Sequence, residues 1–585
     1  MKQFLKFTLA SSIGLIIGVF ALIIIISVLA TSGESKNTKL KEEHILSLKL
    51  HGSIQDRYEE SPFEIYDLMG EESSTLGLNN ILKNIKKAKS DENIKGIFLD
   101  IGFLNAGFAT IGEIRKALLN FKESGKFIVS YSETYTQRAY YLASVADDIC
   151  IYPEGALEYN GLNSSTIFYT NALKKIGIEP QIIRHGKFKS AVEPFILNEM
   201  SDSNREQVTI FVNSIWDEFQ ENVARERNIS VEKLNEIANN LMVRTPKDAL
   251  DLGLVDQLHY KDELHEHFTD LMGKDNFDDV TFISLKKYDS VQNENLVEKL
   301  KKDKIAVVYA QGEIVSGAGS ETTIGSDRIS KAIRKARKDE KVKAIVLRVN
   351  SPGGSALASD VIWREMKLAQ KKKPVVVSMG DVAASGGYYI ACGADKIYAS
   401  PNSITGSIGV FGIVMNVEEL LTDKLGLTFD QVKTNKFSDM GSINRPLSKE
   451  EYDIIHESVV HIYEDFILKV AEGRQMNKLD VDNIGQGRVW SGSSALKTNL
   501  IDEFGGLEDA IEEASILAKM EHFQIYELPK QQDPFQKLLN QLEEGVKTSW
   551  MKSQLGNQYK YYKTLEDLKS LKGVQARMPY QFVID

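Results

Sequence analysis

A serine set among small residues marks the part of the sequence that is most suited to chemistry. The segment Ala383–Gly387 (Ala-Ala-Ser-Gly-Gly) follows a β-branched run and precedes a helical pattern. A serine at such a junction can present its hydroxyl to a substrate backbone, and the positive end of the helix dipole favours negative charge there. Serine beside glycine is also a common helix cap, so the pentapeptide alone does not establish Ser385 as a nucleophile.

Two further glycine turns accompany this serine. The segment Asn350–Gly354 closes a strand-like run, and the backbone N–H groups of Gly353 and Gly354 are able to point at an oxyanion. Loss of one such donor slows acyl transfer by about 10²–10³-fold. Taken alone, the segment also reads as an ordinary turn. The segment Thr405–Gly409, which includes Ser407, is a third polar glycine turn.

A nucleophilic serine requires a base. No histidine lies between His267 and His456, so a Ser-His-Asp triad has no local candidate. Lysine serves as a base when burial lowers its pKa, because desolvation disfavours the charged form. The segment Lys187–Phe195 (Lys-Phe-Lys-Ser-Ala-Val-Glu-Pro-Phe) supplies Lys189, and His185 stands four positions earlier as a rival base.

The chain repeats itself at an offset of about 248 residues, which is the signature of an internal duplication. Asp91–Ile101 resembles Asp339–Val349, and Tyr140–Asp147 resembles Tyr388–Asp395. The repeat divides the chain into an N-terminal segment and two domains followed by a helical tail: residues 1–33, 45–270, 300–525 and 530–585.

Strand-like and helical patterns alternate in both copies, which is typical of an α/β fold with a largely parallel sheet. In the second copy we expect strands at 305–310, 344–349, 375–379 and 397–399, with helices at 326–338, 358–370 and from Ser385 onwards. Long helices are expected at 202–227 and 448–474. The tail reads as helical over 534–573, with a closing strand at 578–584.

The two copies differ at the positions that carry chemistry. In the first copy, the positions aligned with Ser385, Ser407 and the glycine pair hold Gln137, Tyr159, Asn105 and Ala106. The second copy has Ser438 where the first has Lys189. The copies are therefore complementary, which predicts one composite site that combines the serine of the second copy with the lysine of the first.

The N-terminus carries an uncharged apolar run from Phe7 to Ala30. Its length, about 24 residues, is enough to cross a bilayer, which predicts a transmembrane helix at about 8–30. A cleaved signal peptide is the alternative, although its apolar region is usually about 7–15 residues. Lysines lie on both sides of the run, so charge does not decide its orientation.

Composition excludes several classes of protein. The chain has 585 residues, 42% of them hydrophobic, and a net charge of −11, so we expect no nucleic-acid partner. Its two cysteines, Cys150 and Cys392, provide neither a disulfide framework nor a metal cluster. Two buried free thiols and one long-range disulfide both remain open, and we expect no metal.

These motifs resemble the long form of signal peptide peptidase, or protease IV, a Ser-Lys peptidase family of the crotonase/Clp-protease superfamily. The resemblance covers nearly the whole chain and is most specific at Lys187–Phe195, Ser351–Gly354, Met379–Gly387 and Thr405–Gly409. It implies a tandem duplication of a crotonase/Clp-like domain. It further implies that Ser385 is the nucleophile, Lys189 the general base and Ser407 the hydroxyl that orients the lysine, with the oxyanion hole at Gly353, Gly354 and Gly386.

The resemblance also implies a cellular setting. We expect a bacterial inner-membrane protein with a cytoplasmic N-terminus and a periplasmic catalytic body that assembles as a homotetrameric bowl. The expected substrates are apolar peptides such as cleaved signal peptides, and no cofactor is required. An acyl-CoA-binding crotonase-type enzyme and a catalytically silent membrane scaffold are the alternative functions.

Overall fold

The computed structural model describes residues 42–58, 75–291, 303–531 and 574–578, together with a few separate positions before residue 42. Most of the predicted transmembrane span at about 8–30 lies outside the described residues, as do residues 532–573 and 579–585. Among the described residues, no helix combines the length and the apolar character needed to cross a membrane.

The first repeat is built on a parallel sheet. Its strands lie in the order β8-β1-β3-β4-β5-β7, and β2 also pairs with β1. Their bounds are β1 (His44–Gln55), β2 (Thr75–Gly77), β3 (Ile94–Asn105), β4 (Phe127–Tyr135), β5 (Asp148–Leu157), β7 (Gln257–Leu258) and β8 (Phe282–Ser284).

Apolar side chains cover both faces of this sheet, as a parallel sheet requires. Leu46 and Leu48 of β1 belong to the core cluster that also takes in α2 (Leu78–Ser90) and α3 (Phe108–Lys122). Ile45 points to the other face and packs in a separate cluster with α10 (Lys261–Leu271). The alternation along β1 follows from the two-residue period of a strand.

The second repeat has the same strand order. The order β20-β9-β12-β14-β15-β19 corresponds strand for strand to that of the first repeat, with β16 and β18 added beyond β14. Their bounds are β9 (Lys304–Gln311), β12 (Val342–Ser351), β14 (Val375–Ala384), β15 (Lys396–Ala399), β16 (Ile404–Gly406), β18 (Val489–Ser491), β19 (Glu503–Phe504) and β20 (Gln524–Leu528). The α/β unit is therefore duplicated. Cys150 and Cys392 are both buried and free.

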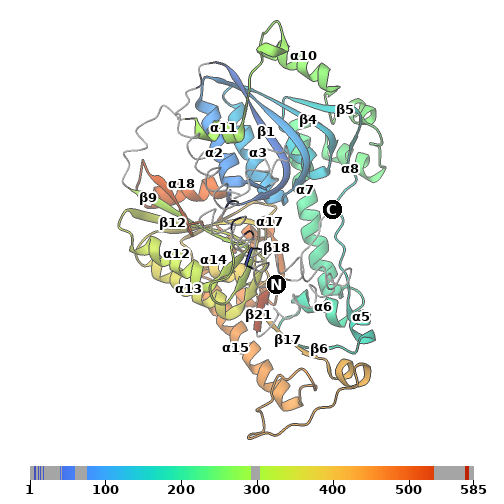
Figure 1. Cartoon of the computed structure of the whole chain (residues 1–585), viewed down its shortest axis with the longest axis vertical. Helices are drawn as coiled ribbons and strands as arrows, with labels where there is room; N and C mark the ends of the chain where they lie inside the picture. The colour runs from blue at the N-terminus through green and yellow to red at the C-terminus, as the bar shows by residue number, and fades with distance from the viewer. Residues whose placement is uncertain are drawn as a thin grey trace.

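A third sheet, in the order β11-β10-β13-β21-β17-β6, combines strands from both repeats and from the tail. The strands of this sheet are β6 (Glu179–Arg184), β10 (Glu313–Val315), β11 (Thr323–Gly325), β13 (Gly353–Ser355), β17 (Phe411–Asn416) and β21 (Val574–Arg577). Strand β6 comes from the first repeat and pairs antiparallel with β17 of the second, so the two lie side by side in Figure 1. The chain just before Lys189 is thereby fixed to the second repeat.

Buried charges also join the two repeats. The guanidinium of Arg348 on β12 is fully buried and lies 2.8 Å from Asp56 and 2.7 Å from Glu113, both in the first repeat. Glu113 of α3 also accepts the backbone N–H of Leu507, at the start of α18 (Leu507–Leu517), at 2.7 Å. In return, Asp381 of the second repeat accepts the N–H of Thr110 at 2.9 Å, near the start of α3. Each repeat thus satisfies a helix N-terminus of the other.

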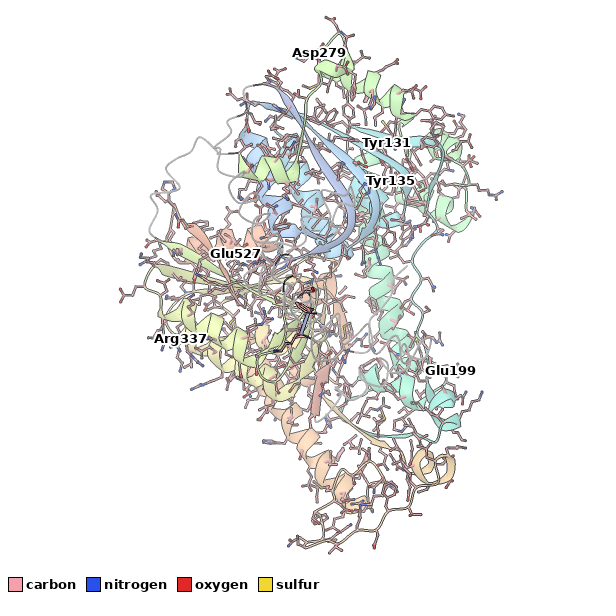
Figure 2. The ribbon with its side chains drawn as sticks, viewed as in Figure 1. Tyr131, Tyr135, Glu199, Asp279, Arg337 and Glu527 are labelled. Carbon is pink, nitrogen blue, oxygen red and sulfur yellow. The ribbon has the colours of Figure 1, made fainter. Side chains whose placement is uncertain are left out.

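A further polar contact lies at the edge of this junction. Glu527 of β20, labelled between the two halves of the molecule in Figure 2, accepts hydrogen bonds from Arg57 at 3.1 Å and from Asn79 at 2.7 Å. Both donors belong to the first repeat. The relative placement of the repeats is therefore set by directional contacts as well as by apolar packing.

Candidate active site

The candidate nucleophile occupies a sharp junction between a strand and a helix. Ser385 lies between β14 and α14 (Gly386–Ala391), with φ 56° and ψ −114°. Such a sparsely populated backbone conformation costs about 1–3 kcal/mol and persists only where the surroundings impose it. Its N–H donates to the carbonyl of Gly406 at 2.8 Å, and its carbonyl accepts from Tyr389, also at 2.8 Å. These two hydrogen bonds fix the backbone that carries the serine hydroxyl.

The lysine of the first repeat reaches this hydroxyl within one chain. Lys189 Nζ lies 2.8 Å from Ser385 Oγ, 3.0 Å from Ser407 Oγ and 3.2 Å from the Ser407 carbonyl oxygen. All three side chains are fully buried. The structure therefore brings together the serine and the lysine that come from different copies, with Ser407 beside the amine.

Burial determines the protonation of this lysine. It holds the pKa of the Lys189 amine well below its usual range. An amine whose pKa is lowered is more often neutral, and a neutral amine offers a lone pair to a neighbouring hydroxyl. The arrangement is therefore able to take the proton from Ser385 Oγ.

A glycine loop of the second repeat packs directly against the lysine backbone. Gly487 has φ 84°, and a Cβ at this position would lie 2.6 Å from the N and Cα atoms of Lys189. Phe188 N–H donates to the Gln486 carbonyl at 2.9 Å, and Gly487 N–H donates to the Ile408 carbonyl at 2.7 Å. Only glycine fits here without displacing the lysine. The sequence prediction missed Gly487, although Gly-Gln-Gly at 485–487 is a turn signal.

The three glycines predicted to form the oxyanion hole, Gly353, Gly354 and Gly386, make different contacts. Gly386 is the first residue of α14, so its N–H has no acceptor within the helix. The backbone of Gly353 approaches it closely, because a Cβ on Gly353 would lie 2.8 Å from Gly386 N. Gly353 N–H donates to Ser351 Oγ at 3.1 Å. A Cβ on Gly354 would meet the Ile314 carbonyl of β10, so Gly354 packs on that strand.

Strand β21 of the tail lies against these glycines. It pairs antiparallel with β13 (Gly354 opposite Ala576) and with β17 (Gly412 opposite Val574). The Ala576 carbonyl oxygen would lie 2.1 Å from a Cβ on Gly353 and 3.0 Å from one on Gly386. The position beside Ser385 thus accepts an extended chain by strand addition, a common mode of peptide recognition.

His185, the alternative base, contacts a tyrosine ring rather than Ser385 in the described structure. The ring of His185 packs on the ring of Tyr463, with centroids 4.5 Å apart. The hydrogen bond to Ser385 Oγ comes from Lys189 instead. Within the described ranges, no group of three or more His, Cys, Asp or Glu side chains is placed to hold a metal ion.

Both repeats match a known peptidase family. The model of peptidase family S49 matches residues 120–274 and 367–521, one stretch in each repeat, and the model of Clp protease matches residues 298–405. "Protease 4" of Haemophilus influenzae is 34% identical over 85% of this chain and 83% of its own. "Protease 4" of Salmonella typhi is 36% identical over 82% and 76% of the two chains. "Serine protease SPPA, chloroplastic" of Arabidopsis thaliana is 32% identical over 92% and 78%.

Proposed function

Because this chain belongs to peptidase family S49 and is a serine-type peptidase, we propose that Ser385 is its nucleophile and Lys189 its general base. One observation carries the proposal, namely the contact of 2.8 Å between Lys189 Nζ and Ser385 Oγ at a fully buried position. Ser407 orients the amine in this scheme, since its hydroxyl and its carbonyl both lie within hydrogen-bond distance of Nζ.

The reaction then follows from the geometry. Lys189 takes the proton of Ser385 as Oγ attacks the carbonyl carbon of the peptide bond. The developing oxyanion is stabilised at the Gly386 N–H, beside the turn of Gly353 and Gly354. Lys189 gives its proton to the leaving amine, and an acyl-enzyme remains on Ser385. Water activated by the same amine hydrolyses this ester and restores the serine.

Apolar peptides bound in extended form, such as cleaved signal peptides, are the proposed substrates. The place of β21 supports this, since that strand pairs with β13 and β17 beside the nucleophile. Ala576 and Met578 are buried among apolar side chains there. A substrate would displace this strand or bind in its manner.

Cleavage of an apolar peptide tests the function. The purified full-length chain is expected to unquench an internally quenched apolar peptide, whereas Ser385→Ala is expected to leave it intact. Binding of an acyl-CoA thioester without peptide cleavage would instead support the crotonase-type alternative. Absence of both activities in the folded wild-type chain would support the silent scaffold.

The apolar run at 7–30 supports a membrane anchor. In the proposed topology this single span holds the protein in a bacterial inner membrane, with a cytoplasmic N-terminus and a periplasmic catalytic body. Alkaline carbonate extraction of membranes is expected to leave the chain in the pellet. Release of the intact chain into the supernatant contradicts the anchor.

The contact between the repeats supports a ring of subunits. The segment of the second repeat that aligns with β6 is 428–433, and it is exposed, with Val432 at 100%. The segment of the first repeat that aligns with β17 is 163–168, where Ile167 is 69% exposed. Each of the paired strands β6 and β17 thus has a counterpart in the other repeat that carries an exposed apolar side chain. Head-to-tail pairing of such surfaces closes a ring, here the proposed homotetramer.

Charged substitutions in the exposed segment 428–433 are expected to dissociate the ring into monomers and to leave the active site of each chain intact. Light scattering of the detergent-solubilised chain should give a tetramer, and Phe429→Glu/Val432→Glu should give monomers. Short-peptide cleavage should persist, because each chain holds its own Ser385 and Lys189. Ile516→Glu, an exposed apolar residue on α18, is the control. A double variant that stays tetrameric contradicts the proposed ring contact.

The pH dependence of activity follows from the buried amine. Burial lowers the pKa of Lys189, and only the neutral amine serves as a base, so kcat/KM should rise with pH through this lowered pKa. The rising limb of the pH profile, which is the pH range over which kcat/KM increases, should lie well below the ordinary lysine pKa of about 10.4. A pH series of initial rates measures it. A limb at the ordinary lysine value would show that the amine is solvated in the working enzyme.

A further inference from the structure

The segment that carries Lys189 is tied to a buried glutamine on a neighbouring helix. Gln207 lies in the second turn of α7 (Asp202–Arg227) and is 1% exposed. Its Nε2 lies 2.9 Å from Ser190 Oγ and 3.3 Å from the Phe188 carbonyl oxygen. The amide therefore bonds to the residues on both sides of Lys189.

The other end of the same amide faces the second repeat. Gln207 Oε1 accepts the N–H of Val489 on β18 at 3.1 Å. Val489 pairs with Gly406 of β16, and the adjacent Arg488 carbonyl accepts the N–H of Ser407 at 2.6 Å. A single buried side chain thus connects the backbone around the proposed base with the backbone around Ser407.

We propose that Gln207 is a positioning residue, which fixes the Lys189 segment against the second repeat. It thereby keeps Lys189 Nζ buried from water and within hydrogen-bond distance of Ser385. The inference rests on the proposed Ser385–Lys189 dyad and adds a residue to it. Gln207 touches neither the nucleophile nor a substrate, and it acts through the lysine backbone.

The chemistry of the contacts explains why this residue is a glutamine. The position needs donors towards Phe188 and Ser190 and an acceptor towards Val489, which a neutral amide supplies together. The two long helices share a serine N-cap, Ser201 in α7 and Ser448 in α15 (Lys449–Arg474). Aligned on these caps, the position of Gln207 holds Ile454 in the second copy, which is 37% exposed. The amide therefore occurs in the copy that carries the lysine.

Other charges around the lysine have partners of their own. The charged or titratable side chains nearest to it in the chain and in space have these partners: Glu193 contacts Ser201, Asn204 and Arg184, Glu206 pairs with Arg488, Lys187 lies over the Phe188 ring, and His185 packs on Tyr463, which bonds to Asp482. Burial is the cause of the lowered pKa of Lys189. Loosening the segment would admit water and move this pKa back towards its usual value.

The test compares pH profiles of the full-length chain on an internally quenched apolar peptide. Gln207→Ala is expected to lower kcat/KM at pH 7 by about 10²-fold, the order of loss that a 1 Å misplacement brings. It should also move the rising limb to higher pH. Gln207→Glu keeps the acceptor for Val489 but loses the donors and adds a negative charge. It keeps the size of the side chain, so it should fold with a lower Tm than the wild type and shift the limb in the same direction.

Gln220 provides the matched control, because it is a fully buried glutamine on the same helix. Gln220→Ala should lower Tm without moving the limb. If Gln207→Ala lowers Tm but leaves the limb in place, the residue is merely structural and the proposal is overturned. If Gln207→Ala does not fold, an unshifted limb in Gln207→Glu overturns it as well. An active Lys189→Ala variant refutes the dyad itself, and the inference falls with it.

Discussion

Replacing Lys189 by alanine is expected to lower kcat by about 10⁴-fold or more, the order of loss seen when a member of a nucleophile–base unit is removed. Ser385 Oγ would then lose the amine that lies 2.8 Å away, and no other base is placed on it in the described structure. Rates of peptide cleavage at pH 7–9 measure the effect. Ser385→Ala should be equally inactive, because the two residues act as one unit.

His185→Ala is the matched variant for this experiment. It removes an imidazole four residues before the lysine, whose ring packs on Tyr463. Most of the activity should therefore remain. The reverse pattern, with His185→Ala inactive and Lys189→Ala active, would assign the base to His185 and contradict the proposed dyad.

Replacing Arg348 by leucine is expected to destabilise the protein by about 3–5 kcal/mol, because breaking a buried ion pair leaves uncompensated charge. Asp56 and Glu113 of the first repeat would lose a guanidinium that lies 2.8 Å and 2.7 Å from them. Urea unfolding of the full chain measures the change. Activity should fall too, since the same contact sets the placement of the repeats that lets Lys189 reach Ser385.

Arg334→Leu is the control for this variant. Arg334 pairs with Glu365 but is half exposed, and Arg337 still pairs with the same carboxylate, so the loss should be about 0–1 kcal/mol. Adding Asp56→Asn and Glu113→Gln to Arg348→Leu should restore part of the stability. An Arg348→Leu protein as stable as the Arg334→Leu protein would show that the buried charges do not hold the repeats together.

Regular elements of the second repeat were predictable from local patterns. The expected helix 326–338 coincides with α12 (Ser326–Lys338), and 358–370 lies within α13 (Ala356–Gln370). The expected strand 375–379 continues to Ala384 as β14 and so delivers Ser385 directly. The α/β class follows from the same local patterns, and the duplication follows from the sequence repeat at an offset of about 248 residues. The predicted domain bounds stay predictions, since nothing in the structure tests them.

The third sheet was not predictable, because its partners are far apart in the chain and short. β6 pairs with β17, and β21 enters from the tail between β13 and β17. The sequence predicts a closing strand at 578–584, whereas the described strand is Val574–Arg577. The predicted tail helix at 534–573 and residues 579–585 lie outside the described residues.

The sequence predicts the reacting residues of the candidate site but not the residues that hold them in place. Comparison of the two copies pointed to Ser385 and Lys189, because each is replaced in the other copy. Gln207 was missed, although extending the comparison into the long helices would have shown the change from glutamine to isoleucine. The hydrogen bond from Gly353 N–H to Ser351 Oγ depends on a side-chain rotamer, which residue spacing does not determine.

Chemical labelling of the nucleophile tests the central proposal most directly. The full-length chain would be treated with a fluorophosphonate at several pH values, and the modified residue identified by peptide mass spectrometry. We predict one adduct, on Ser385, formed along the same pH limb as catalysis and almost absent in Lys189→Ala. An adduct on another residue, or unchanged labelling of Ser385 in Lys189→Ala, would contradict the proposed dyad.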